Sequence, residues 1–225
     1  VVRNGSLVSN AQTFAGESGL VSVVLGGGVG LTKTTVGLLE LTNANQYTGL
    51  TLVTDGTLLL SGGNDRLWTG GSLTISGGVL DLGGNTQNTS GLVMLSGGVV
   101  QNGTYVSSGK TYAGNHGYVS AVLAGTVGLT KSGSGLLELT NGNLYSGLTL
   151  VNEGTLLLSG ADNRLWMGGS ITVSGGTLDL GGNTQNTSGL VSLLSGVVRN
   201  GSLVSNTQTI AGESGLVSAV LGGGV

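Results

Sequence analysis

The sequence contains no cysteine and no proline, and only 8% of its 225 residues are charged. Without cysteine the chain has no disulfide bonds, no thiolate metal ligands and no thiol nucleophile. The absence of proline, with no glycine at a strict third position, excludes a collagen-like fold. Because His116 is the single histidine, the sequence also lacks the ligands of a transition-metal site. We therefore expect no metal and no cofactor.

Charge of either sign is scarce, and long apolar runs are missing as well. Seven basic and ten acidic residues give a net charge of −3, so the chain has no basic face for nucleic acid or an anionic membrane. No apolar run reaches the roughly 18 residues of a membrane helix. Glycine is abundant instead, with 47 residues, and 38% of the chain is hydrophobic. This composition is typical of short apolar strands joined by many turns.

The chain repeats itself every 98 residues. Residues 1–98 and 99–196 are two complete units that match at 67 of 98 positions without an insertion, and residues 197–225 begin a third unit with the same ten residues, VVRNGSLVSN, as the first. A fixed period without insertions is the signature of a solenoid. We therefore interpret residues 1–225 as one continuous solenoid, in which the units are 1–98, 99–196 and the partial 197–225.

A finer period divides each unit into five rungs of about 20 residues, about 12 rungs in all. Aligning short segments such as GLLEL (37–41), GTLLL (56–60) and SAVLA (120–124) gives one column that is aliphatic throughout. That column contains Val2, Val24, Leu39, Leu58, Leu80, Val100, Val122, Leu137, Leu156, Leu178, Val198 and Val220. A column without polar residues predicts side chains that point into the core, while their neighbours along the strand point outward.

The outward neighbours form two columns, one of which is partly apolar. Its apolar members are Leu38, Val79, Val99, Leu136 and Val197, and they are interrupted by Thr57, Thr155 and Thr177. In the same column Ala121 is expected on the surface, and Leu123 in the other. An exposed apolar stripe along a rod is usually an interface, so we expect lateral association of rods through this stripe.

Two segments resemble the autotransporter passenger-associated repeat. They are GLTKTTVGLLELTNANQYTGLTLVTDGTLLLSG (30–62) and GLTKSGSGLLELTNGNLYSGLTLVNEGTLLLSG (128–160), which share a lysine after Leu-Thr, an Asn-x-Tyr-x-Gly turn and a Gly-Thr-Leu strand. The resemblance implies a single-stranded, right-handed parallel β-helix that is exported by the type V route and displayed outside a bacterium. In this family the repeat is a scaffold, and it implies no particular activity.

Enzymatic sites have little support in the sequence. Glu40 and Asp81 share the second outward column about 9.6 Å apart, near the upper end for an inverting carboxylate pair. However, Leu59 separates them, no basic cluster for an acidic sugar lies nearby, and the pair recurs as Glu138 and Asp179. We interpret these carboxylates as solvated strand positions. The segment Gly109-Lys110-Thr111 lacks the glycine spacing of a phosphate loop, and Gly62-Gly63-Asn64-Asp65 is interpreted as a corner turn instead of a calcium site.

The aromatic residues suggest a binding site. Trp68 and Trp166 occupy equivalent positions, and Arg66 and Arg164 precede them by two residues, so an extended Arg-Leu-Trp segment would present guanidinium and indole on one side. Such a pair can stack on a sugar ring or bind a partner protein. The alternative interpretation is structural, with the indole covering the end of a rung.

These observations favour a structural or adhesive role outside a bacterial cell, at its surface or secreted, and no enzymatic activity. Two alternatives remain: a carbohydrate-binding module that uses Trp68 and Trp166, and a polysaccharide-active enzyme. Because the sequence starts and stops within a repeat, we expect a segment of a longer rod, or rods that associate end to end. Further partners would be glycans or the surface of a host or neighbouring cell.

Overall fold

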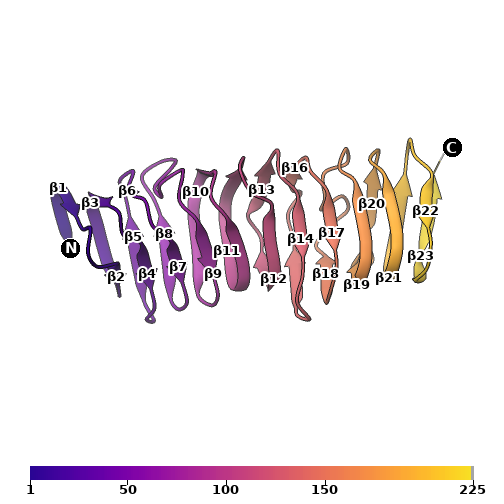
Figure 1. Ribbon diagram of the computed structural model, residues 1–225, viewed down its shortest axis with the longest axis horizontal. Coiled ribbons are helices and arrows are strands. Elements are labelled where there is room, and N and C mark those ends of the chain that lie inside the picture. The colour runs from indigo at the N-terminus through magenta and orange to yellow at the C-terminus, as the bar shows by residue number, and fades with distance from the viewer. Residues whose placement is uncertain (224–225) are drawn as a thin grey trace.

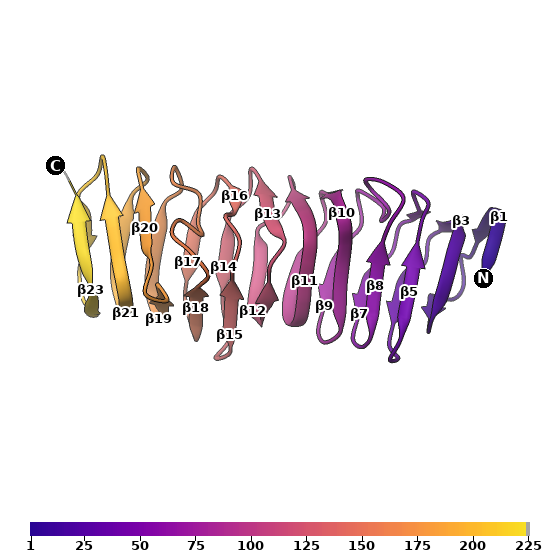
Figure 2. The ribbon, with the colours of Figure 1, turned by 180° about the vertical axis from the view of Figure 1, so that it is seen from behind.

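The computed structural model describes residues 1–223, which form one stack of parallel strands (Figure 1). The strands follow one another along the long axis in chain order, and the view from behind shows the same succession (Figure 2). The described residues contain no helix. The structure therefore confirms the predicted all-β fold, a parallel β-solenoid of about 12 coils.

The strands form three ladders, which are the three faces of the solenoid. The first face contains β5 (Leu38–Leu41), β8 (Thr57–Leu60), β15 (Leu136–Leu139) and β18 (Thr155–Leu158). The second face contains β6 (Gln46–Tyr47), β13 (Val122–Gly125), β16 (Leu144–Tyr145) and β20 (Thr184–Thr187). The third face contains β2 (Phe14–Gly16), β4 (Leu31–Lys33), β7 (Thr51–Val53), β9 (Leu73–Ile75), β14 (Leu129–Lys131), β17 (Thr149–Val151) and β22 (Ile210–Gly212).

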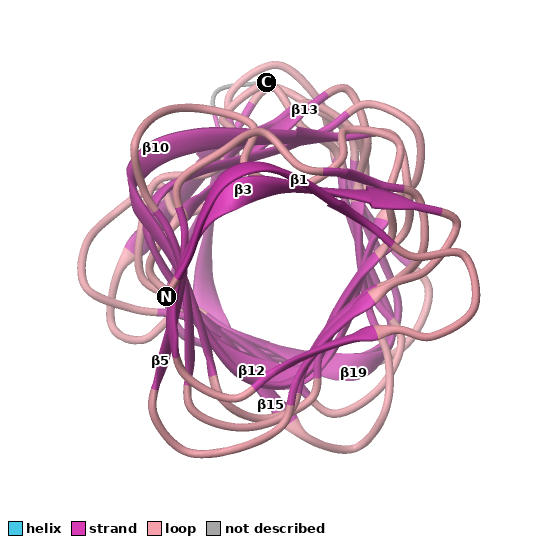
Figure 3. Cartoon of the chain, turned by 90° about the vertical axis from the view of Figure 1, so that its left-hand side faces the viewer, coloured by secondary structure: helices cyan, strands magenta, loops and turns pink. Residues whose placement is uncertain are grey.

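Longer strands turn the corners and contribute to more than one face. They are β1 (Val2–Val8), β3 (Gly19–Gly27), β10 (Val79–Thr89), β11 (Val93–Ser107), β12 (Tyr112–Val119), β19 (Ile171–Asp179), β21 (Val191–Ser205) and β23 (Leu216–Gly223). Viewed from the N-terminal end, the chain starts at the left, follows β1 over the top and recedes from the viewer (Figure 3). This clockwise course is the right-handed sense that parallel crossovers prefer.

The interior is filled by aliphatic side chains that lie above one another in successive coils. Leu58, Leu80, Leu156 and Leu178 are completely buried, and their backbones are paired across neighbouring coils. Leu39, Val100, Leu137 and Val198 are buried as well. For these eight positions, the predicted core column is confirmed. Such a dry column stabilises the fold because each side chain removes apolar surface from water.

The predicted register was wrong at the fifth rung of each unit. Val100 pairs with Val119, and Val119 pairs in turn with Leu139. Val122 lies on the second face, where it pairs with Thr104 and is only half-buried. The two neighbours that were expected to point outward, Ala121 and Leu123, are buried. The segment around them is apolar at both alternations, so its period did not determine which set faces the core.

The same error applies to the equivalent valines near the two ends of the chain. Val24 pairs with Ser6, and Val220 pairs with Ser202, both on the second face. Val2 does lie on the first face, paired with Val21, but it is 46% exposed. The corrected register gives every rung a similar length, because the short step between the fifth rung and the next unit disappears.

An asparagine followed by a glycine forms the corner between the first and second faces in β1, β11 and β21. Asn102 and Asn200 both have φ of 56°, and the glycines after them have φ of 149°. Asparagine is one of the few residues besides glycine that adopts a positive φ at low cost. A Cβ at Gly103 would also lie 2.3 Å from the backbone oxygen of Asn85 in the previous coil. Both the conformation and the close approach therefore require this pair.

Buried amide side chains connect neighbouring coils on the second face. The Asn45 amide accepts a hydrogen bond from Leu25 N at 2.8 Å and donates to Arg66 O at 2.8 Å. Gln87 accepts from Leu67 N and donates to Leu67 O, at 2.8 and 3.1 Å. Asn143 and Gln185 make the same bonds in the second unit. These bonds satisfy backbone groups at a corner where the strand ladder is interrupted.

Candidate binding surface

The two tryptophans lie on the second face and are partly open to solvent. Trp68 is 39% exposed and Trp166 is 42% exposed, whereas Leu67 and Leu165 directly before them are buried. Both tryptophans lie in loops, between β8 and β9 and between β18 and β19, and the burial of the leucine before each of them leaves the indole on the outside. The two sites are equivalent in sequence and in fold.

The arginines of the Arg-Leu-Trp segments are bound within the protein. The Arg66 guanidinium donates to the backbone oxygen of Thr42 at 2.6 Å and to that of Asn64 at 2.6 and 3.0 Å. Arg164 binds the corresponding oxygens of Thr140 and Asp162. The guanidinium groups therefore fasten the corner to the previous coil. The described structure shows no stacking of either arginine on its tryptophan.

A glycine turn supports each indole from one side. A Cβ at Gly70 would lie 2.5 Å from the indole nitrogen of Trp68, and one at Gly168 would lie 2.6 Å from that of Trp166. The turn closes with a hydrogen bond from Gly71 N to Trp68 O at 2.9 Å. A residue with a side chain at either position would require the indole to move. The indole is therefore held against the backbone while its remaining surface faces solvent.

Neighbouring coils place an amide on each side of Trp68. Asn45 N donates to Arg66 O at 3.1 Å, and since Asn45 and Leu67 are both buried, the next residues, Gln46 and Trp68, point outward side by side. On the other side, the Gln87 amide binds Leu67, which places Asn88 beside Trp68. The row along the axis is thus amide, indole, amide.

The second unit differs at this row. Leu144, 53% exposed, takes the place of Gln46, while Asn186 corresponds to Asn88. Met167, 52% exposed, takes the place of Thr69. The surface around Trp166 is therefore more apolar than the surface around Trp68. Leu148 and Leu190 at the adjoining corner are exposed in the second unit, as Leu50 and Leu92 are in the first.

The predicted apolar stripe lies on the first face, in two offset parts. One part pairs Leu38, Thr57, Val79, Val99 and Tyr118 in successive coils. The other pairs Leu136, Thr155, Thr177, Val197 and Leu216. Tyr118 pairs with Glu138 and not with Leu136, so the stripe shifts by two residues between the units. Leu38 and Leu136 are 46% exposed, and the three valines of the stripe are half-buried.

The carboxylates that were considered as a catalytic pair are bound internally. Glu40 and Asp81 do share a column, separated by Leu59. Glu40 accepts a hydrogen bond from the Ser61 hydroxyl at 2.5 Å. Asp81 accepts three hydrogen bonds, from Gly83 N, Gln101 Nε2 and Asn102 Nδ2, each at 2.8 Å. The three hydrogen bonds to Asp81 stabilise the corner between Asp81 and Asn85, where β10 passes from the first face to the second.

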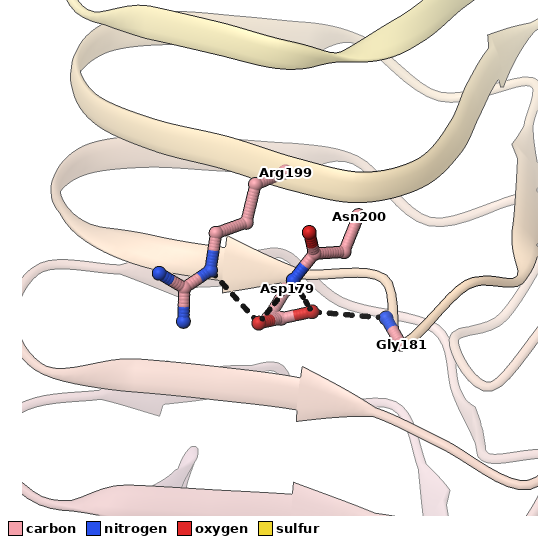
Figure 4. A network of polar contacts seen from close by, with 4 residues as sticks. All are labelled: Asp179, Gly181, Arg199 and Asn200. Atoms are coloured by element: carbon pink, nitrogen blue, oxygen red, sulfur yellow. Dashed lines mark hydrogen bonds and ion pairs between the residues drawn. The ribbon is translucent and has the colours of Figure 1, made fainter.

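In the second unit, Asp179 is buried, which corrects its assignment as a solvated position. Arg199 Nε donates to it at 2.8 Å, Gly181 N at 3.0 Å, and Asn200 Nδ2 at 3.0 and 3.1 Å (Figure 4). Burial raises the pKa of the Asp179 carboxyl, but the hydrogen bonds from Gly181, Arg199 and Asn200 outweigh it and hold that pKa below its ordinary value. Asp179 therefore connects two coils as a charged structural residue.

Sequence reasoning missed two buried lysines. Lys33 and Lys131 are completely buried although both carry a charge. The Lys131 ammonium donates to the backbone oxygens of Ser132, Gly133 and Glu153, at 2.9, 2.5 and 3.0 Å. Lys33 binds the oxygens of Thr35 and Asp55 in the same way. The signal was present in the sequence, because Leu-Thr-Lys is identical in both units and belongs to the repeat motif.

The remaining candidates lie in strand β12 (His116) or in loops (Lys110 and Asp65). His116 and Lys110 are exposed, and Asp65 accepts hydrogen bonds from the backbone and side chain of Asn88 in the next coil, at 2.8 and 2.9 Å. Residues 1–223 contain no group of three or more His, Cys, Asp or Glu side chains placed to hold a metal ion. Over the same residues, no helix is long and apolar enough to cross a membrane.

Comparison with known proteins identifies the repeat. The model of the passenger-associated-transport repeat matches residues 31–60, 55–82, 129–158 and 154–180. These four segments are passenger-associated-transport repeats. The matches overlap the two segments whose motifs resemble this family. They extend beyond these segments to the start of β10 in the first unit and to the end of β19 in the second. Autotransporter passengers carry this repeat, so the chain is extracellular, at the bacterial surface or secreted.

One curated relative is the protein named Adhesin BmaC autotransporter, from Brucella suis biovar 1 (strain 1330). It is 41% identical over 88 residues, which are 39% of this chain and 2% of that protein. The chain thus spans about 2% of the length of the relative it matches. No solved structure matches the chain.

Proposed function

We propose that this chain is a stiff segment of a bacterial surface rod that carries an adhesive surface. The observation that supports this most is the parallel strand pairing that connects each coil of residues 1–223 to the next from β1 to β23, together with a repeated exposed face. The name of the relative, an adhesin autotransporter, supports the adhesive part. Each coil advances the rod by about 4.8 Å, so one unit of five coils spans about 24 Å.

Stiffness follows from how the coils are connected. Strand ladders on the first and third faces connect neighbouring coils, and on the second face strands alternate with loops that single backbone hydrogen bonds connect. Side chains such as Asn45, Gln87, Lys131 and Asp179 add further bonds at the corners. Bending the rod would separate hydrogen bonds on one side and compress a close-packed core on the other. A rod of this kind can hold an adhesive surface at a fixed distance from the cell.

A bead assay tests the adhesive role. Beads coated with the purified chain should bind cultured host cells or neighbouring bacteria more strongly than beads coated with an unrelated solenoid of similar charge. We expect soluble chain to compete for the same sites. Binding no greater than that of the control solenoid on every surface tested would contradict the adhesive role.

We further propose that the chain acts without catalysis. The four carboxylates with the geometry closest to a glycosidase pair each accept hydrogen bonds from the protein itself. An assay for reducing sugar released from neutral and acidic polysaccharides should give the rate of the buffer alone. Release that is lost in Asp81→Asn would contradict this proposal.

A further inference from the structure

We infer that the row formed by Gln46, Trp68 and Asn88, the Trp68 row, is a binding site for an uncharged pyranose ring. The indole is the stacking platform, and the amides of Gln46 and Asn88 are the hydrogen-bonding groups at its two edges. The inference rests on the proposed adhesive function and names the class of ligand for it. Its geometry comes from three adjacent coils of the second face.

The platform packs against the backbone of its own turn and is partly exposed to solvent. The Gly70 backbone lies against the Trp68 ring, and the Arg66 guanidinium holds the preceding corner through Thr42 and Asn64. A partly exposed indole whose orientation is fixed loses little entropy when a ligand stacks on it. The apolar C–H face of a pyranose is the kind of surface that such a ring binds.

The spacing of the row matches the size of a sugar ring. Adjacent coils are about 4.8 Å apart, so the amides of Gln46 and Asn88 lie on either side of the indole at about that distance along the axis. Within residues 1–223 the Gln46 side chain has no hydrogen-bond partner, and Asn88 is oriented by Asp65 at 2.9 Å. Hydroxyl groups at the two edges of a stacked ring can therefore bond to these amides.

The charge of the surface favours an uncharged ligand. The nearest cation, Arg66, donates to backbone oxygens from three of its nitrogen atoms, and the chain as a whole has a net charge of −3. A uronic acid or sialic acid would find no free cation at this row. A neutral hexopyranose needs none.

The second unit provides a natural comparison. At Trp166 the first amide is replaced by Leu144, so only Asn186 remains at an edge. We therefore infer a weaker site at Trp166 for the same ligand. Losing one neutral hydrogen bond weakens binding by about three- to tenfold.

Because the chain has only two tryptophans, single-tryptophan variants report each site separately by fluorescence. W166A leaves Trp68, and W68A leaves Trp166. Each is titrated with cellohexaose as a neutral probe and with an oligogalacturonate of the same length as an acidic probe. All five side chains to be changed are exposed, and matched urea midpoints with the parent chain verify that each variant is folded.

We expect cellohexaose to titrate Trp68 in W166A, and to bind three- to tenfold more weakly to Trp166 in W68A. In the W166A background, Gln46→Leu should weaken binding to the level of the second site, whereas Gln12→Leu, at an exposed glutamine elsewhere, should not. In the W68A background, Leu144→Gln should strengthen binding by a similar factor.

Three results would overturn the inference: no titration of Trp68 by the neutral probe, equal or stronger binding of the acidic probe, or no effect of Gln46→Leu. The bead assay separates these failures from a failure of the proposed function. Beads that still adhere when the neutral probe does not titrate Trp68 would place adhesion on another surface. Beads that do not adhere at all would contradict the adhesive role itself.

Discussion

Four buried tyrosines should make the solenoid unfold at alkaline pH. Tyr47, Tyr105, Tyr112 and Tyr145 are at most 2% exposed, and burial raises the pKa of each hydroxyl well above its ordinary value of about 10. A raised pKa in the folded state means that the folded chain retains protons that the unfolded chain releases. The stability from these groups is therefore complete below pH 10 and is lost as the pH rises above it.

The magnitude follows from proton linkage. Each tyrosine that ionises only in the unfolded chain removes up to about 1.4 kcal/mol per pH unit, so the four together should remove about 5 kcal/mol between pH 10.5 and 11.5. Burial lowers the pKa of Lys131, which acts in the opposite direction. Its effect is already halved near pH 10.5, where the lysines of the unfolded chain have lost half of their protons, and it fades across the chosen window, so it offsets only a small part of the loss.

Urea denaturation at several pH values measures this loss, and phenolate absorbance follows the tyrosines directly. The double variant Tyr47→Phe/Tyr145→Phe should halve the slope, at a cost of about 1 kcal/mol per lost hydrogen bond to Thr51 and Thr149 at neutral pH. Tyr118→Phe, at an exposed tyrosine, is the control and should leave the slope unchanged. A stability that does not fall above pH 10.5, or a slope that the double variant does not reduce, would refute the reasoning.

Three further changes test the core, the corner and the stripe. Leu156→Ala should cost about 2 to 5 kcal/mol by leaving a cavity, whereas Thr155→Ala beside it should cost under about 1 kcal/mol, as measured by urea midpoints; the reverse order would contradict the register. Asp179→Ala should cost about 1 to 3 kcal/mol by leaving its donors unpaired, and an unchanged midpoint would show that the corner does not depend on it. The double variant Val79→Lys/Val99→Lys should remain folded but should no longer associate laterally, as measured by sedimentation in high salt. Bundling equal to that of the parent chain would exclude this stripe as the contact.

The fold could be predicted because one aliphatic column recurs about every 20 residues. Leu39, Leu58, Leu80 and Val100 belong to it, and all four are buried one above the other in successive coils. The pattern failed at Val122 because that segment is apolar at both alternations, so only the pairing of its backbone shows which side chains are buried.

The surface was harder to predict than the core. Trp68 stood out as a repeated aromatic residue, but the amides on either side of it come from other coils and are separated from it by about 20 residues. The burial of Lys131 and Asp179 was missed for another reason: charged residues usually lie on surfaces, and hydrogen bonds supplied by neighbouring turns, which the sequence does not place, stabilise them in the interior.

A distance between two equivalent positions tests the stacked coil most directly. Because the chain has no cysteine, Leu38→Cys/Leu136→Cys places one spin label in each unit, at sites that are both 46% exposed and five coils apart. Pulsed electron spin resonance should give one narrow distribution near 24 Å, five times the rise per coil. A broad distribution, or a distance far from that value, would contradict the rigid solenoid on which the proposed function depends.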